Sequence, residues 1–198
     1  MSDDDDDMSR HGTILSQTAL IAQHTRERAI FDKEFNMPEA FVAGLNDNTR
    51  NKVIDLLNAR LTDVISLAMA TKQAHWNLRG PGFIGVHELL DDVADRLRES
   101  SDLIAERAVI LGGYARGTSE IVAQETTMSA YPVEERDIQI HIEALRERFL
   151  DVGEKIRAAL EEAGDIGDDD TEDLFTEVSR QIDKDAWFIG ANAPAPTS

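Results

Sequence analysis

Residues 72–113 read KQAHWNLRGPGFIGVHELLDDVADRLRESSDLIAERAVILGG and contain two of the five histidines in the chain. Apolar residues recur at three- and four-residue spacing from about residue 46 to residue 77, which predicts an amphipathic helix. Gly-Pro-Gly at 80–82 ends that pattern. The same spacing resumes over about 83–111 and stops at Gly112-Gly113. This stretch therefore predicts two long helices that are antiparallel neighbours, because the turn between them is short.

Two further amphipathic patterns follow, over about 134–163 and about 171–190, with an Asp- and Gly-rich turn at 165–170 between them. No alternation typical of strands is present, so the sequence predicts an all-α four-helix bundle. The long passage between helices two and three carries a short helix near 118–125, which suits a crossover of the ferritin-like kind. We divide the chain into three parts: an acidic N-terminal tail and arm (1–45, with a short helix or arm at 13–35), the bundle (46–192) and a flexible C-terminal tail (193–198).

The chain is strongly acidic, with 39 Asp and Glu against 20 Lys and Arg and a formal charge of −19. Such a surface attracts hard cations and repels a phosphate backbone unless basic residues cluster, although acidity also serves solubility alone. The absence of cysteine excludes disulfides, thiolate metal sites and thiol nucleophiles, and is compatible with the cytosol. No apolar run is long enough to span a membrane, and the N-terminus MSDDDDDMSR lacks the features of a secretory signal.

Four polar side chains of the second predicted helix are candidate metal ligands. On a helical wheel, His87, Asp91, Asp102 and Glu106 share an arc that points away from the apolar stripe. Asp91 and Asp102 are eleven residues apart, about 16 Å along a helix, so one chain cannot bring both to one metal ion. A second copy of the helix, antiparallel across a two-fold axis, can. His75, just before the turn, can then reach the His87 end.

These residues also have ordinary interpretations. A lone histidine on an amphipathic stripe is more often a core residue than a ligand, and single carboxylates on a helix are usually solvated. As a set, imidazole and carboxylate ligands without sulfur suit iron, zinc or manganese. Spacing alone does not choose between a metal site and a structural one.

The same stretch resembles the ferroxidase motif of the Dps family, the mini-ferritins of the ferritin-like superfamily. The resemblance extends from about residue 46 to residue 192 and is strongest in the following segments. They are Lys72-Gln73-Ala74-His75-Trp76-Asn77, Arg79-Gly80-Pro81, Phe83-Ile84, Val86-His87-Glu88, Leu90-Asp91, Asp102, Ile104-Ala105-Glu106-Arg107-Ala108, Leu111-Gly112-Gly113, Asp168-Asp169-Asp170-Thr171 and Asp183-Lys184-Asp185-Ala186-Trp187-Phe188-Ile189.

The resemblance implies a homo-oligomer, a hollow dodecamer that oxidises ferrous iron with hydrogen peroxide, or more slowly with dioxygen, and stores ferric mineral. It implies two iron sites per dimer interface, where zinc or manganese can substitute. His75, His87 and Asp91 would come from one chain, and Asp102 and Glu106 from its partner. Trp76 and Lys72 would lie beside the site, although a core tryptophan and a surface lysine are the ordinary interpretations.

Two more acidic sets are candidates for handling iron. We expect the first to face the cavity and nucleate mineral, with a solvated face as the alternative: Glu88, Asp92, Asp95 and Glu99. The second falls where the family's three-fold iron pores are lined, with helix capping as the alternative: Asp168, Asp169, Asp170 and Asp173.

The sequence departs from the DNA-binding members of the family, which often carry a Lys-rich tail. Its N-terminal tail is acidic, and no basic residue follows Lys184. We therefore expect weak or no direct DNA binding. The resemblance implies a cytoplasmic protein that protects against oxidative stress. The alternatives are a nucleoid-associated DNA-protecting protein with secondary iron oxidation, and a helical scaffold with vacant sites.

Overall fold

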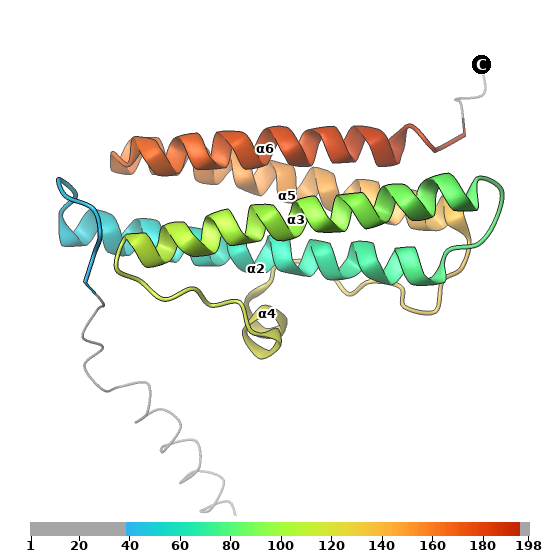
Figure 1. Cartoon of the computed structure of the whole chain (residues 1–198), viewed down its shortest axis with the longest axis horizontal. Coiled ribbons are helices and arrows are strands. Elements are labelled where there is room, and N and C mark those ends of the chain that lie inside the picture. The colour runs from blue at the N-terminus through green and yellow to red at the C-terminus, as the bar shows by residue number, and fades with distance from the viewer. Residues whose placement is uncertain (1–38, 195–198) are drawn as a thin grey trace, which may run out of the picture. The chain divides into compact units, whose positions relative to one another are not determined.

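The computed structural model describes residues 39–194, which form five helices and no strand. The helices are α2 (Asp47–Asn77), α3 (Phe83–Ile110), α4 (Ser119–Glu125), α5 (Ile138–Ile166) and α6 (Asp169–Gly190). The four long helices lie side by side, and short α4 lies outside them in the crossover from α3 to α5 (Figure 1). This confirms the predicted all-α bundle. The acidic tail and the predicted arm at 13–35 lie outside the described residues.

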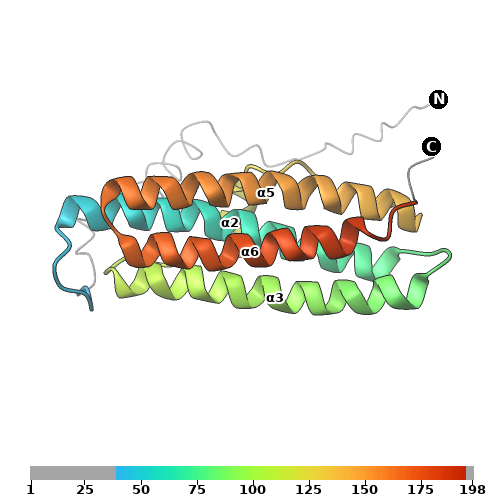
Figure 2. The same ribbon diagram turned by 90° about the horizontal axis from the view of Figure 1, so that it is seen from above.

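The turn between α2 and α3 requires glycine at two positions. Gly80 and Gly82 have positive φ angles of 138° and 79°, which side chains with a Cβ rarely adopt. A Cβ on Gly80 would also lie 3.0 Å from Cγ2 of Ile138, so the start of α5 packs directly against this turn. The turn therefore sets the antiparallel pairing of α2 and α3 (Figure 2).

The core is formed by the apolar stripes that the sequence pattern identified. Leu57 of α2, Leu97 of α3, Phe149 of α5 and Phe175 of α6 are each at most 1% exposed. Burying one such side chain contributes about 1.5–3 kcal/mol. One core shared by all four helices therefore holds the bundle together.

The structure moves the predicted start of α5 from about residue 134 to Ile138. The chain before it is held extended, because Arg79 N donates to Arg136 O (2.7 Å) and Ile138 N donates to Arg79 O (3.2 Å). The Asp137 side chain then caps the helix by accepting from Gln139 N at 2.8 Å. At the other end the predicted 165–170 turn is shorter, and only residues 167–168 separate α5 from α6.

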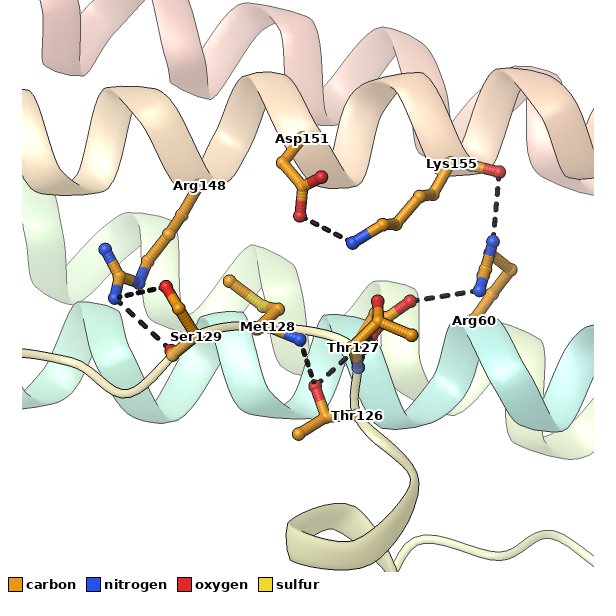
Figure 3. A network of polar contacts seen from close by, with 9 residues as sticks. Arg60, Thr126, Thr127, Met128, Ser129, Arg148, Asp151 and Lys155 are labelled. Atoms are coloured by element: carbon orange, nitrogen blue, oxygen red, sulfur yellow. Dashed lines mark hydrogen bonds and ion pairs between the residues drawn. The ribbon is translucent and has the colours of Figure 1, made fainter.

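A buried aspartate of α2, Asp63, holds the crossover segment that follows α4 in place. Asp63 is 0% exposed, and its Oδ1 accepts from Thr127 N (3.0 Å) and from the hydroxyls of Thr126 (3.2 Å) and Thr127 (3.1 Å). Arg60 Nη2 lies 3.1 Å from Asp63 Oδ2, and Arg60 Nη1 donates to Lys155 O of α5 (Figure 3). The segment after α4 is thereby attached to α2.

None of the helices within residues 39–194 is long and apolar enough to cross a bilayer.

Candidate metal centre

His75 and His87 face each other across the tight turn. Their rings stack with centroids 3.8 Å apart and planes 16° apart. Each Nδ1 lies against the other residue's backbone carbonyl, at 2.8 Å for His75 and 2.9 Å for His87. A carbonyl only accepts, so Nδ1 carries the proton in both rings. In the neutral rings, Nε2 is therefore the atom with a free lone pair, and it is oriented by a carbonyl as in metal-binding histidines.

Asp91 brings a carboxylate to the histidine pair from one turn further along α3. Its Oδ1 lies 4.0 Å from His75 Nε2, and the side chain is 55% exposed. Lys72 of α2 forms an ion pair with the same oxygen. The hydrogen bond from Lys72 is the largest cause that lowers the pKa of Asp91, so this carboxylate stays ionised at neutral pH. Lys72 Nζ also lies 6.0 Å from the centre of the Trp76 ring.

Asp102 and Glu106 lie toward the other end of α3, and both are exposed. The predicted arc is present, because Leu90 and Ile104 of the same helix are 1% and 0% exposed while Asp91 is open to solvent. Within residues 39–194, no group of three or more His, Asp or Glu side chains in this single chain could hold a metal ion. A site that uses all five residues therefore requires ligands from a second chain.

A groove of about 720 Å³ runs beside these ligands, between α2, α3 and residues 115–118. Its walls are largely apolar and include Ile65, Met69, Trp76 and Ala105, and Asp102 also lines it. Met69 is 57% exposed and Trp76 68% exposed. Large apolar side chains that are exposed together typically mark an association surface.

The four candidate nucleation acids are all exposed, and they are Glu88, Asp92, Asp95 and Glu99. Asp95 forms an ion pair with Arg98 at 2.8 Å. Exposure leaves both interpretations of this row open, as a mineral-binding surface or as a solvated face.

Asp168 differs from the other three acids at the start of α6. It is 3% exposed, caps the helix through Thr171 N, and accepts from Arg107 Nη2 at 2.6 Å. For Asp168 the capping alternative therefore holds, since its oxygens are already occupied. Asp169, Asp170 and Asp173 remain exposed.

One contact of the site was absent from the sequence analysis. The Phe83 ring stacks on His87 with centroids 5.0 Å apart. Phe83 precedes His87 by four residues, so the two share a helix face, and this spacing could have suggested the contact. The His87 ring is therefore in contact with two other rings, those of His75 and Phe83.

A family match, related proteins and a solved structure all relate this chain to the same group of proteins. A ferritin-like domain matches residues 54–193. A protein of Agrobacterium fabrum named "DNA protection during starvation protein" is 47% identical over 148 residues, covering 75% of this chain and 91% of that protein. A protein of the same name from Mycolicibacterium smegmatis is 34% identical, covering 76% of this chain and 82% of that protein. The structure of DpsA14 from Streptomyces coelicolor has a TM-score of 0.75 at 35% identity and covers 81% of this chain and 98% of that one.

The fold and the match over 54–193 therefore define a ferritin-like four-helix protein. Within that class, the relatives from Agrobacterium fabrum and Mycolicibacterium smegmatis both carry the name "DNA protection during starvation protein". The chain belongs to this family, the Dps family, as its sequence motif indicated.

Proposed function

We propose that this protein is a ferroxidase and an iron store that protects against peroxide. The observation that carries the proposal is the division of its ligands along α3. His75, His87 and Asp91 lie near one another at one end of the helix, while Asp102 and Glu106 are exposed towards the other end. Ferrous iron is the substrate of such a site, and imidazole nitrogens with carboxylate oxygens are suitable ligands for it.

A two-fold pair of chains supplies the missing ligands. With α3 antiparallel to its copy, Asp102 and Glu106 of the partner come opposite the histidine end, and two equivalent sites form. The exposed apolar groove beside α3 supports this arrangement, because the pair would bury Met69 and Trp76. We propose that six such pairs assemble into the hollow dodecamer implied by the family.

The ligands favour oxidation because carboxylates stabilise ferric iron more than ferrous iron. Two ferrous ions in one site give one electron each to hydrogen peroxide. Its O–O bond breaks, and with two protons the products are two ferric ions and two waters. A paired transfer avoids release of hydroxyl radical, which is the protective consequence. Lys72 and Trp76 lie next to the site, and we propose that they act beside the ligands and do not bind iron themselves.

Ferric iron would then be stored in the cavity of the assembly. We propose that the exposed row of Glu88, Asp92, Asp95 and Glu99 takes part in nucleating the mineral. Asp169, Asp170 and Asp173 are exposed at the start of α6, and we propose that they line the pore through which iron enters. We leave Asp168 out of this proposal because it is buried against Arg107.

Direct DNA binding is expected to be weak. The relatives are named for DNA protection, but this chain carries a formal charge of −19. Association with a phosphate backbone requires clustered cations that release counterions. A mobility shift of duplex DNA that persists at about 0.15 M salt without divalent metal would contradict this expectation and favour a nucleoid protein.

Anaerobic titration with ferrous iron, followed by peroxide, tests the function. We expect saturable ferrous binding with a stoichiometry near two irons per site, and fast oxidation when peroxide is added. The variant H75A/H87A should lose both. Unchanged oxidation in that variant would refute the ligand assignment. A sizing column supplies an independent test, since an isolated monomer or dimer has no storage cavity.

A further inference from the structure

A second groove, of about 320 Å³, lies between α3 and α6 and has no role in the proposed oxidation. It contains three basic side chains in a strongly acidic chain. The residues that matter for its chemistry are Arg96, Glu99, Glu177, Arg180, Gln181 and Lys184. α3 and α6 lie next to each other along this side of the bundle (Figure 2).

Arg180 and Lys184 are one helical turn apart on α6, and both are exposed. Within residues 39–194, neither makes a hydrogen bond or an ion pair, although most of the other basic side chains there have acidic or carbonyl partners. Lys184 only lies over the Phe188 ring, with Nζ 5.6 Å from its centre. Two cations without anionic partners in one groove leave donors free for a bound anion.

Arg96 forms a fixed wall of the groove. Its Nε and Nη2 donate to Oδ1 of Asp185 at 3.0 and 2.6 Å. Asp185 is 0% exposed, and its Oδ2 accepts from Gln181 Nε2 at 3.0 Å. The guanidinium is therefore held in place by a buried carboxylate, while Nη1 makes no hydrogen bond within residues 39–194 and can donate to a ligand.

Two carboxylates, Glu99 and Glu177, line the same groove but do not pair with Arg180 or Lys184. They would oppose an anion that can only accept hydrogen bonds. Inorganic phosphate near neutral pH keeps a protonated oxygen, which donates to a carboxylate while its other oxygens accept from guanidinium and ammonium groups. Sulfate has no such proton. The mixture of donors and acceptors thus suits phosphate better than sulfate.

We propose that the α3–α6 groove is a binding site for inorganic phosphate, held by Arg180, Lys184 and the free Nη1 of Arg96. A small anion fits a groove of about 320 Å³. A nucleic acid does not suit it, because Glu99, Glu177 and the acidic row on α3 would repel an extended phosphate chain.

The position of the groove indicates a role for the bound phosphate. Glu99 belongs both to the groove and to the exposed acidic row of α3. If the proposed iron storage holds, phosphate bound here lies beside carboxylates that can hold ferric iron. The groove then supplies the counter-anion of a ferric phosphate mineral. Only this last step rests on the proposed function, since phosphate binding itself needs no iron.

The test is calorimetric titration of the iron-free assembled protein with sodium phosphate. The variant R180Q/K184Q removes the two unpaired cations, and K52Q/R136Q is the matched control. Lys52 and Arg136 are exposed, their side chains make no hydrogen bond or ion pair within the described residues, and both double variants change the charge equally. Binding should weaken by about tenfold or more in the groove variant and stay unchanged in the control.

Equal weakening in both variants, or no saturable binding by the wild type, would overturn the proposal. The proposal would also be overturned if sulfate bound as tightly as phosphate. The same holds if duplex DNA bound the wild type and this binding were lost in R180Q/K184Q but not in the control. A second measurement is the phosphate-to-iron ratio of mineral grown in phosphate buffer, which should fall only in the groove variant. If no mineral forms while the calorimetric difference persists, the storage function fails and the phosphate site stands.

Discussion

Two sets of carboxylates in this bundle have opposite surroundings. Asp63, Asp168 and Asp185 are at most 3% exposed, and each lies against an arginine. Asp91, Asp102 and Glu106 are exposed on α3, and of these only Asp91 has a cationic partner, Lys72, within residues 39–194. Asp168 and Asp185 link α6 to α3, and Asp63 attaches the segment after α4 to α2. The second set is open to solvent on α3. Burial and an arginine partner thus separate structural acids from candidate ligands.

The two sets should respond differently to substitution. Removing a buried acid leaves a buried or partly buried arginine without its counter-charge, which costs stability. Removing an exposed ligand changes stability little, because its charge was already solvated, but deletes an atom that the metal needs.

The largest effect is expected for D102A/E106A. Each site then loses both partner carboxylates, so the initial rate of ferrous oxidation should fall by about 100-fold or more, given that even one outer-shell change costs 10–100-fold. Stopped-flow absorbance after addition of peroxide measures the rate. The matched control D55A/E154A also removes one exposed Asp and one exposed Glu, on α2 and α5. An equal loss of rate in the control would point to surface charge rather than ligation.

Asp63→Ala should lower the free energy of unfolding by about 3 kcal/mol, because Arg60, whose side chain is only 14% exposed, is left without a counter-charge. Denaturant unfolding measures the loss. Within residues 39–194, Arg60 Nε and Asp63 Oδ2 lack hydrogen-bond partners, so the pair is an imperfect one. R60M/D63L, which removes both charges, should therefore recover part of the loss. A double variant less stable than Asp63→Ala would contradict this reasoning.

Mild acid should loosen the segment between α4 and α5. His141 is 1% exposed; its Nδ1 lies 2.7 Å from the Tyr131 hydroxyl, and its Nε2 donates to Glu135 O. Burial lowers the pKa of His141 below its ordinary value of 6.5, and burial likewise raises the pKa of Tyr131, so the hydroxyl remains a donor.

The unfolded state binds the His141 proton more readily than the folded state does. The contribution of buried, neutral His141 to the free energy of unfolding is therefore complete above about pH 6.5 and declines as the pH falls below it. Unfolding measured from pH 7.5 to pH 5 should show this decline, and His141→Gln should flatten it. An identical pH dependence in wild type and variant would exclude His141 as the cause.

The smallest effect is expected for Asp95→Ala. Its ion pair with Arg98 is exposed on both sides, and such pairs contribute about 0–1 kcal/mol. Thermal unfolding should shift little, and ferrous oxidation should keep its rate. A large loss of stability would contradict the rule that exposure separates the two sets.

Within residues 39–194, sequence periodicity predicted the number, order and approximate bounds of the helices, because each apolar stripe is local information. It could not place the start of α5, since Asp137 is fixed by a turn far away in the chain, through Arg79. The wheel also identified the exposed arc of Asp91, Asp102 and Glu106. It could not show that His75 and His87 exchange hydrogen bonds with each other's carbonyls, because that contact depends on how the Gly-Pro-Gly turn closes.

The central claim is that each iron site is shared between two chains, and a mixing experiment tests it directly. H75A/H87A and D102A/E106A should each be inactive alone, since every site in either assembly is broken. Co-assembly of the two variants should restore oxidation at about a quarter of the sites, because half of random two-fold pairs are mixed and each mixed pair contains one intact site. No recovery in assemblies proven to be mixed would contradict the shared site.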